Sequence, residues 1–460
     1  METLSYRIAL RFAKTLNVVL VTTPLMLCWL VCYVWGMGIP GTRVVTALIT
    51  ALFVILYVTY GRIYDGFLLS LVRISELVYS QSLALLMSDG LMYVVICLVG
   101  HRLVSPVPIL ALFGVQLVLV VLWCVTAHKW YFKVYPPKKT AVICQREDNV
   151  EELIGAYGLR KKFEVTKTVE AESCMRRNFA PLDGVDTVFL CGLGSHERNQ
   201  ILKYCVENNL VAYVLPSIGD ILMSGARKMH LFHLPFLRVG RYGPNPEYLF
   251  VKRLFDIVVS ATALVVLSPV MLITALAIKL TDGGPVFYRQ KRLTQNGRIF
   301  SVMKFRSMRQ DAEKDGVARL STGDKDDRIT PVGRIIRKVR IDELPQLFNI
   351  LGGSMSIVGP RPERPEIAAQ YEKALPEFSL RLQAKAGLTG YAQVYGKYNT
   401  TPYNKLQMDL MYIAHPSFWE DLRIIFVTIK ILFIPESTEG VAEGMETAMA
   451  KKEEKEKVEV

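Results

Sequence analysis

Long apolar stretches fill the first part of this sequence and constrain its fold more than any other feature. They cover residues 16–34, 44–60, 77–99 and 107–127. Each is close to the roughly 20 residues that a helix needs to cross a bilayer. We therefore predict a membrane protein in which residues 1–135 form a four-helix transmembrane bundle.

Basic residues indicate the topology of this bundle. They precede the first stretch, lie between the second and the third, and follow the fourth: Arg7, Arg11, Lys14, Arg62, Arg73, Lys129, Lys133, Lys138 and Lys139. Positively charged loops remain on the cytoplasmic side of a membrane. The N-terminus and the chain after the bundle should then both be cytoplasmic. No small-residue cleavage site follows the first stretch, so we interpret it as a retained anchor.

Composition alone excludes few functions. A formal net charge of +13 suits nucleic acid, anionic lipid or phosphorylated substrates equally well. The eight cysteines show neither metal-ligand nor disulfide spacing, which argues against a zinc site and a disulfide framework. We interpret Asp89, inside the third stretch, as a polar break near the end of that span; a functional intramembrane carboxylate is the alternative.

The pattern changes after the bundle. Short apolar runs alternate with helix-like segments over residues 136–235, which predicts a small, Rossmann-like cytoplasmic α/β domain. Its GLGS sequence at 192–195 lacks the full dinucleotide fingerprint, so we favour a structural or regulatory role over nucleotide binding. Residues 236–247 are predicted to be a linker, residues 248–435 a further α/β domain, and the charged residues 436–460 a disordered tail.

A fifth apolar run, residues 257–280, differs from the others. Ser268 and Pro269 lie near its middle, where proline removes a backbone donor and bends a helix. Lys252 and Arg253 precede the run and many basic residues follow it, so both ends should stay on the cytoplasmic side. We predict a re-entrant helix in a monotopic domain at the headgroup level, with a true fifth crossing as the alternative.

An acidic pair carries the strongest chemical signal. Asp342 and Glu343 stand together in RIDELPQLFNIL at 340–351, and a turn bearing Arg361 follows. Phosphoryl transfer needs a nucleophile, a divalent ion and fixed positive charges. One carboxylate can be the nucleophile while its neighbour suits Mg²⁺, if Pro345 makes the helix irregular there. The alternative is an exposed helix face on which the acids balance neighbouring basic residues.

Ordered motifs in the last part of the chain resemble those of the polyprenyl-phosphate phosphoglycosyl transferases, bacterial sugar transferases that initiate surface glycan assembly. The resemblance covers residues 248 to about 433 and rests on KRLFDIVVSATALVVLSPV, GGPVFYRQKRLTQNGRIFSVMKFRSM, RIDELPQLFNIL, SIVGPRP and AGLTGYAQVYGK. It implies that Asp342 takes the phospho-sugar of a UDP-sugar and that Glu343 binds Mg²⁺. UMP would then leave, and undecaprenyl phosphate would attack the intermediate.

The same resemblance implies further site residues. Arg361 looks like the family arginine that contacts phosphate, and Lys304 and Arg306 resemble additional diphosphate contacts. Gln393 matches the family's GxTGxxQVxG segment, together with Gly387, Gly390 and Gly396; this segment lies either close to a ligand or in a structural loop. Ser354 and Lys397 depart from the family, which usually has aspartate and arginine there.

The family implies a bacterial inner-membrane protein that begins exopolysaccharide or capsule repeat-unit synthesis, and a homodimer. We expect a UDP-hexose donor, undecaprenyl phosphate and membrane lipid as partners, and no nucleic acid. One alternative is a glycosyltransferase that releases UDP, which the lack of a separate DxD motif disfavours. Another is a non-catalytic, membrane-anchored regulatory or scaffold protein. A transporter is disfavoured because the spans show no inverted repeat.

Overall fold

The computed structural model describes residues 2–144, 150–309, 328–396 and 400–432. The predicted charged tail, 436–460, and Lys397 lie outside the described residues. Contacts divide the chain into two compact units, Met1–Leu215 and Pro216–Val460. Each has its own buried cluster of apolar side chains.

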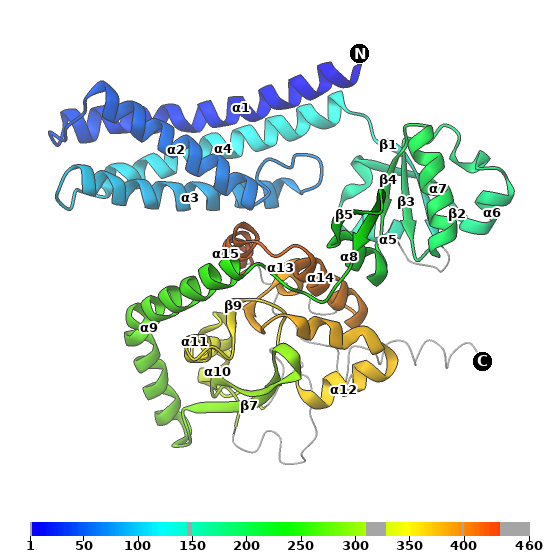
Figure 1. Cartoon of the computed structure of the whole chain (residues 1–460). Helices are drawn as coiled ribbons and strands as arrows, with labels where there is room; N and C mark the ends of the chain where they lie inside the picture. Colours follow the sequence, from blue (N-terminus) through cyan, green and yellow to red (C-terminus); the bar gives the residue numbers. More distant parts are fainter. Residues whose placement is uncertain (1, 145–149, 310–327, 397–399, 433–460) are drawn as a thin grey trace. The chain divides into compact units, whose positions relative to one another are not determined.

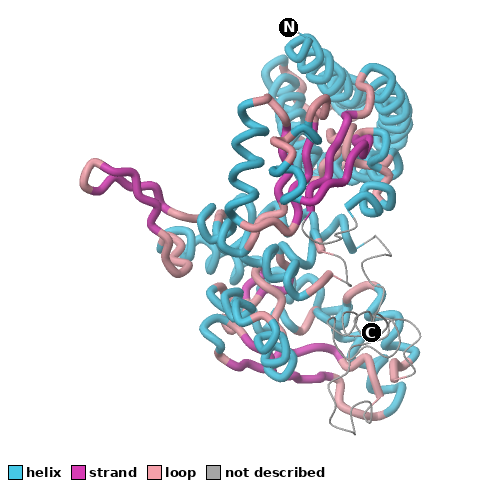
Figure 2. Tube along the Cα trace, turned by 90° about the vertical axis from the view of Figure 1, so that its right-hand side faces the viewer, coloured by secondary structure: helices cyan, strands magenta, loops and turns pink. Residues whose placement is uncertain are grey.

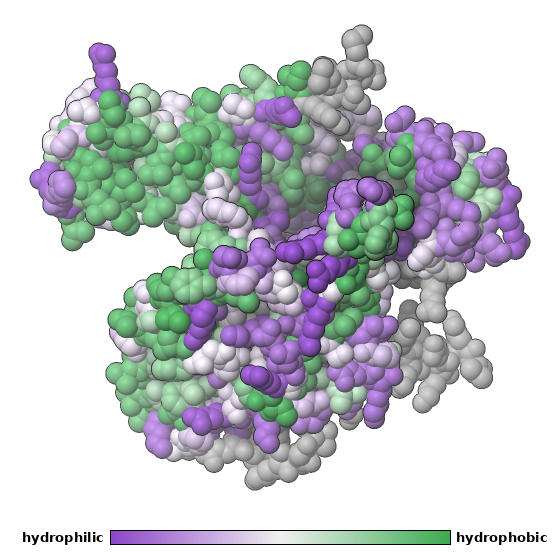
Figure 3. Space-filling model, in the orientation of Figure 1, coloured by the Kyte–Doolittle hydropathy of each residue, from purple (hydrophilic) through white to green (hydrophobic). Residues whose placement is uncertain are grey.

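Long helices open the first unit (Figure 1). They are α1 (Glu2–Cys28) with its π-helical continuation η1 (Trp29–Trp35), α2 (Arg43–Ile63), α3 (Ile74–Val99) and α4 (Val107–Val134). The four predicted apolar stretches thus all form helices, and hydrophobic side chains cover much of their surface (Figure 3). Including α9 of the second unit, five described helices are long and apolar enough to cross a membrane, so the chain is a membrane protein.

Asp89 differs from its prediction. It is 5% exposed and lies within the unbroken helix α3, so the expected polar break near the end of a span is wrong. The hydroxyl of the neighbouring Ser88 donates to the Ala84 carbonyl (2.7 Å), which satisfies this polar group inside its own helix. The helix therefore continues through the polar residues.

A parallel sheet completes the first unit. Its strands are β1 (Lys138–Cys144), β2 (Phe163–Glu170), β3 (Thr187–Cys191) and β4 (Val211–Val214), in the order β2-β1-β3-β4. The connecting elements are α5 (Val150–Ala156), η2 (Leu159–Lys161), α6 (Ala171–Arg176), η3 (Ala180–Leu182) and α7 (Ser195–Glu207). The central strands β1 and β3 are mostly buried, as parallel strands usually are.

The second unit is a mixed α/β domain. Its first elements are α8 (Ile218–Ser224), β5 (Arg227–Leu231), β6 (Leu234–Arg238), α9 (Pro246–Asp282), β7 (Phe287–Leu293), η4 (Gln295–Gly297) and β8 (Ile299–Phe305). Then follow α10 (Pro331–Lys338), η6 (Ile341–Glu343), α11 (Gln346–Leu351), β9 (Ser356–Val358), α12 (Pro365–Ala374), η7 (Pro376–Gln383), β10 (Gly387–Thr389), α13 (Tyr391–Tyr395), α14 (Pro402–Ala414) and α15 (Phe418–Leu432). The pairs β5–β6 and β7–β8 are antiparallel, and β9–β10 is parallel.

The β5–β6 hairpin belongs to the second unit, although the sequence assigned residues up to 235 to the parallel sheet domain. The segment before it is fastened to α14, because Gln407 donates to the Pro216 carbonyl (2.5 Å) and Gly225 packs closely on Ala414. The predicted linker 236–247 begins inside β6 and ends inside α9. Figure 2 shows the hairpin projecting from the other elements of its unit, and Phe232 at its tip is 84% exposed.

Helix α9 changes direction part-way along its length (Figure 1). It remains continuous through the predicted break at Ser268 and Pro269. Pro269 has no N–H for the carbonyl of Val265, and the hydroxyl of Ser268 donates to that carbonyl instead (2.7 Å). The Ser-Pro pair can therefore bend the helix without interrupting it.

The first half of α9 is fastened to the domain by polar contacts. The guanidinium of Arg253 donates to the carbonyls of Ile350 and Leu351 at the end of α11 (2.7 and 2.8 Å). The buried carboxylate of Asp256 accepts from the N–H of Ile357 (3.0 Å). We call these contacts the α9–α11 clasp.

Candidate active site

The acidic pair lies in an irregular turn between α10 and α11. Arg340, two residues before Asp342, adopts a left-handed conformation (φ 58°), and the pair lies in the 3₁₀ turn η6 that follows it. Pro345 then directly precedes α11 as its N-cap residue. On a regular helix, neighbouring side chains point about 100° apart. The turn is thus the irregular backbone that a pair with divided roles requires.

Three basic side chains surround Glu343. The Lys304 ammonium is 2.7 Å from its carboxylate, and the guanidinium groups of Arg340 and Arg361 are 3.7 and 3.9 Å away. Burial raises the pKa of Glu343, but Lys304, Arg361 and Arg340 outweigh burial and hold that pKa below its ordinary value. Glu343 is therefore ionised, and the surrounding cations offer charge-assisted contacts to a phosphate.

Asp342 is enclosed beside it. The residue is 8% exposed, and its Oδ1 is buried without a hydrogen-bond partner among the described residues. Burial, followed by the charge of Glu343, raises the pKa of Asp342 to about 6, against the opposing effect of Lys304, Arg337 and Arg340. At neutral pH this carboxylate is mostly ionised yet poorly solvated. The pair is not the exposed helix face of the alternative interpretation.

Strand β8 brings Lys304 to the pair although the two are distant in sequence. The side-chain amide of Asn349, on α11, bridges to the edge of the strand. Its oxygen accepts from the Met303 N–H (2.9 Å) and its nitrogen donates to the Ser301 carbonyl (2.9 Å). The strand that carries Lys304 is therefore fixed to the helix that follows the acidic pair.

Two glycine-rich motifs pair with each other and carry Arg361 at their edge. The N–H of Gly387 donates to the Pro360 carbonyl (3.0 Å), next to the β9–β10 pair. A Cβ on Gly387 or Gly390 would stand only 2.1 Å from backbone atoms of Gly359. The glycines thus permit close backbone packing, which favours the structural-loop interpretation of this segment.

The remaining predicted residues are placed as follows. Arg306 lies just past the end of β8, and its side chain is buried. Gln393 donates to the Leu388 carbonyl within its own loop (2.9 Å). Ser354 bonds within the turn that ends α11. The described contacts of Gln393 and Ser354 are structural.

Oxygen ligands for a metal ion are few here. No group of three or more His, Cys, Asp or Glu side chains gathers among the described residues. The acidic pair still fits Mg²⁺, because one or two carboxylates suffice when water and substrate phosphates complete the coordination. The buried Oδ1 of Asp342, which has no hydrogen-bond partner in the described part of the chain, adds an oxygen suited to a cation. A metal held here would need phosphate oxygens as co-ligands.

Sequence reasoning did not single out Asn349, Arg381 or Asp409. Arg381 and Asp409 form a buried ion pair (2.6 Å) behind the loop that carries Arg361. Their partners are distant in sequence, so no local pattern marks them. Asn349 alone had a signal, since it stands inside the RIDELPQLFNIL motif.

Comparison with known proteins adds independent evidence. Residues 247–435 match the family described as bacterial sugar transferase. The chain is 37% identical over 239 residues to a UDP-N-acetylgalactosamine-undecaprenyl-phosphate N-acetylgalactosaminephosphotransferase of Aeromonas hydrophila, which covers 51% of this chain and 55% of the relative. It is 38% identical over 212 residues to a UDP-glucose:undecaprenyl-phosphate glucose-1-phosphate transferase of Escherichia coli (strain K12). This match covers 45% of this chain and 44% of the relative.

A shorter relative is matched almost completely. The exopolysaccharide production protein PSS of Rhizobium leguminosarum bv. phaseoli is 43% identical over 190 residues, which are 39% of this chain and 94% of the relative. The matches to the Aeromonas and Escherichia proteins span about half the length of those relatives. The matched family segment contains the acidic pair, Lys304 and Arg361. The chain therefore belongs to the bacterial sugar transferase family, the polyprenyl-phosphate phosphoglycosyl transferases.

Proposed function

We propose that this protein transfers a sugar 1-phosphate from a UDP-sugar to undecaprenyl phosphate and releases UMP. The observation that carries the proposal is the acidic pair. The enclosed Asp342 has an oxygen without a hydrogen-bond partner among the residues that the structure describes, and it lies beside a Glu343 that three cations surround. The Aeromonas and Escherichia relatives are named for reactions of this class. The product would begin an exopolysaccharide or capsule repeat unit.

Asp342 is the proposed nucleophile. In the first half-reaction its carboxylate oxygen bonds to the β-phosphorus of the donor while the bond from that phosphorus to the bridging oxygen breaks, so UMP leaves. In the second, an oxygen of undecaprenyl phosphate bonds to the same phosphorus, and Asp342 regains its free carboxylate. Lys304, Arg306 and Arg361 would balance the negative charge of the phosphates.

Glu343 is the proposed Mg²⁺ ligand. When bound with the diphosphate, the ion supplies positive charge to the phosphate oxygens. The Lys304 ammonium is 2.7 Å from this carboxylate in the structure. The proposal therefore includes a transfer of Lys304 from Glu343 to a phosphate oxygen when the donor binds.

The proposed membrane arrangement has four spans, α1 to α4, and a re-entrant α9. The most exposed apolar side chains of α9 lie on both sides of the bend, with exposures of 54% to 76%: Phe250, Val258, Val265, Val266, Leu272, Ile273, Leu276 and Leu280. The clasp holds the other side of the same helix against its own domain. Such a helix suits burial in one leaflet. The N-terminus, the Rossmann-like sheet domain and the catalytic domain would then face the cytoplasm at the inner membrane.

The donor sugar and the assembly are further proposals. We expect a UDP-hexose, with UDP-glucose and UDP-N-acetylgalactosamine as the first donors to test, since relatives are named for both sugars. We propose a homodimer, as the family resemblance implies. Exposed apolar side chains on the β5–β6 hairpin support a further protein contact: Leu231, Phe232, Leu234 and Phe236.

The test is product analysis with purified protein, undecaprenyl phosphate, Mg²⁺ and a panel of UDP-sugars. We expect UMP with one donor, and no UMP when Asp342 is replaced by asparagine. UDP as the product would instead support the glycosyltransferase alternative. No nucleotide release with any donor, and identical behaviour of the Asp342→Asn variant, would support the scaffold alternative. A radiolabelled sugar retained on denatured wild-type protein, without acceptor, would support the aspartyl intermediate.

A further inference from the structure

A buried ion pair lies behind the loop that carries Arg361. Arg381, on η7, and Asp409, on α14, are 3% and 1% exposed, and their charged groups are 2.6 Å apart. Withdrawing two charges from water is costly, and apolar residues of similar volume often join two elements equally well. Joining η7 to α14 alone therefore does not explain why a buried ion pair is found at this position.

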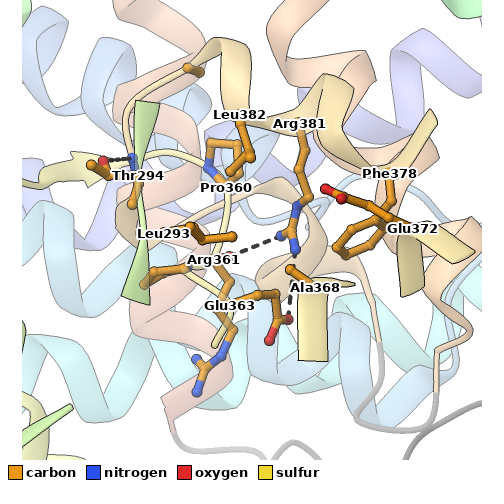
Figure 4. Close-up of a pocket in the computed structure, with 13 residues that line it drawn as sticks. Leu293, Thr294, Pro360, Arg361, Glu363, Ala368, Glu372, Phe378, Arg381 and Leu382 are labelled. Carbon is orange, nitrogen blue, oxygen red and sulfur yellow. Dashed lines mark hydrogen bonds and ion pairs between the residues drawn. The ribbon is translucent and has the colours of Figure 1, made fainter. Parts of the chain in front are cut away.

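Arg381 has further partners in the Arg361 loop. Its guanidinium donates to the Arg361 carbonyl (3.0 Å) and lies 3.6 Å from the carboxylate of Glu363. Figure 4 shows the Arg381 guanidinium turned toward this loop, while the Arg361 guanidinium points away from it. A guanidinium presents its donors in a fixed planar fork. Because the Arg381 guanidinium is rigid, its contact with Asp409 also fixes the position from which it donates to the Arg361 carbonyl.

Strand β7 holds the same loop from another direction. Arg292 donates to the Pro362 carbonyl (3.1 Å) and lies 3.8 Å from Glu363. The Leu293 N–H donates to the Glu363 carbonyl (2.9 Å). Three consecutive residues, 361–363, are thus fixed through their backbone carbonyls. The Arg361 side chain itself is 44% exposed, so its position near Glu343 depends on this fixed backbone.

We propose that Arg381, oriented by Asp409, is a positioning residue for the phosphate contact made by Arg361. The inference rests on the proposed function. Arg381 acts through the Arg361 backbone and touches no reacting atom. A lysine at position 381 would keep the charge opposite Asp409, but a single ammonium lacks the fixed fork that serves Asp409, Glu363 and the Arg361 carbonyl together.

A double-mutant cycle on the full chain in nanodiscs tests this role, with UMP release as the measurement. Arg381→Lys is made alone and together with Arg361→Lys. In the otherwise wild-type chain, Arg381→Lys should lower kcat/KM for the UDP-sugar by about tenfold. In the Arg361→Lys background, the same substitution should lower kcat/KM by less than about twofold, because the arginine that Arg381 positions is already absent. Equal losses in both backgrounds, or no loss from Arg381→Lys alone, would overturn the proposal.

A charge exchange separates positioning from simple joining of elements. Arg381→Asp combined with Asp409→Arg can restore an ion pair between η7 and α14, but it removes the donor to the Arg361 carbonyl. We expect it to recover unfolding temperature relative to Arg381→Asp without recovering kcat/KM. Recovery of both would overturn the proposal. If the exchanged variant does not fold, the lysine cycle decides.

The matched control is another buried ion pair of the same unit, Lys252 with Asp421 (2.8 Å). The effect of Asp421→Asn on kcat/KM should be the same with arginine or lysine at position 361. If the effect of Asp421→Asn on kcat/KM depends on residue 361 as strongly as the effect of Arg381→Lys does, a specific positioning role for Arg381 is overturned. Failure of the wild-type chain to release UMP with any donor would instead reject the proposed function, and the inference with it.

Discussion

The side chains of Asp342 and Glu343 both carry a carboxyl group, but they lie in opposite electrostatic environments. Asp342 is buried, and one of its oxygens lacks a hydrogen-bond partner among the described residues. Glu343 stands among Lys304, Arg340 and Arg361. Ionisation therefore destabilises the folded chain at one position and stabilises it at the next. Substitution by the isosteric amide should separate the two effects.

Asp342→Asn should stabilise the substrate-free protein at pH 7.5 while abolishing UMP release. The pKa of Asp342 is raised from 3.8 to about 6, so ionising this group above pH 6 destabilises the fold by about 2–3 kcal/mol, at roughly 1.4 kcal/mol per pKa unit. An amide does not ionise. The gain in unfolding temperature should therefore shrink as the pH falls toward 4. An equal or lower midpoint for the variant at pH 7.5 would contradict this account.

Glu343→Gln should have the opposite effect. It leaves cations without their counter-charge and removes the 2.7 Å contact with Lys304, at an expected loss of about 1–3 kcal/mol at neutral pH. Because the pKa of Glu343 is held below its ordinary value of 4.5, its stabilising effect is present above that pH and is lost in acid. Denaturant unfolding at pH 7.5 and in acid measures this difference.

A second substitution serves as the control for that experiment. Lys304→Met in the Glu343→Gln background should recover part of the lost stability, because it removes one cation that has lost its partner. No recovery would mean that the loss has another origin. A Glu343→Gln variant more stable than the wild type would reject the electrostatic account of the site.

At the scale of elements, α9 shows what a sequence can and cannot reveal. Its hydropathy and the Ser268-Pro269 pair were sufficient to predict an apolar helix with an irregularity at that point. They did not reveal that the helix continues, because this depends on the Ser268 hydroxyl replacing the missing proline N–H at Val265. Nor did they reveal the clasp, since Arg253 was counted as a topology-determining charge and instead caps the end of α11.

The orientation of α9 can be tested with a single introduced thiol. All eight cysteines of the chain lie in the first unit, before residue 216. A cysteine at Thr281, near the end of α9, therefore labels a peptide that carries no other thiol. If α9 is re-entrant, a membrane-impermeant maleimide should label Thr281→Cys in inverted vesicles and not in intact spheroplasts. Labelling only from outside would establish a fifth crossing.

At the scale of the whole molecule, the motifs identified the residues of the candidate site but not the residues that hold them in place. Asp342, Glu343, Lys304 and Arg361 were chosen from motifs, and the structure brings them together. Arg381 and Asp409 were missed because an ion pair between separate elements leaves no periodic pattern. Contacts place the β5–β6 hairpin in the second unit, whereas the predicted sheet domain extended to residue 235; the segment before the hairpin contacts α14 through Gln407 and the Pro216 carbonyl, which no local pattern marks.

The proposed dimer can be tested at the tip of the hairpin. Phe232→Asp places a charge where an exposed aromatic side chain stands (84% exposed). If the hairpin forms the dimer contact, the measured mass of the protein in nanodiscs should fall from that of a dimer to that of a monomer. His233→Asp adds the same charge at the neighbouring tip position and should change the mass less. A wild-type chain that is monomeric would reject the dimer, and an unchanged dimer in Phe232→Asp would place the contact elsewhere.

The clasp would have one further consequence if the protein transfers its product to a lipid carrier, as we propose. Arg253 and Asp256 tie α9 to α11 and β9, and α11 begins three residues after Glu343. If α9 lies in one leaflet, as proposed, the height of Asp342 above the acyl chains would be set by the protein and not by the lipid. A thinner or thicker bilayer would move the carrier phosphate past a carboxylate that keeps its level. Acyl-chain length would thus become a variable of the reaction rate, and the membrane itself part of the substrate specificity.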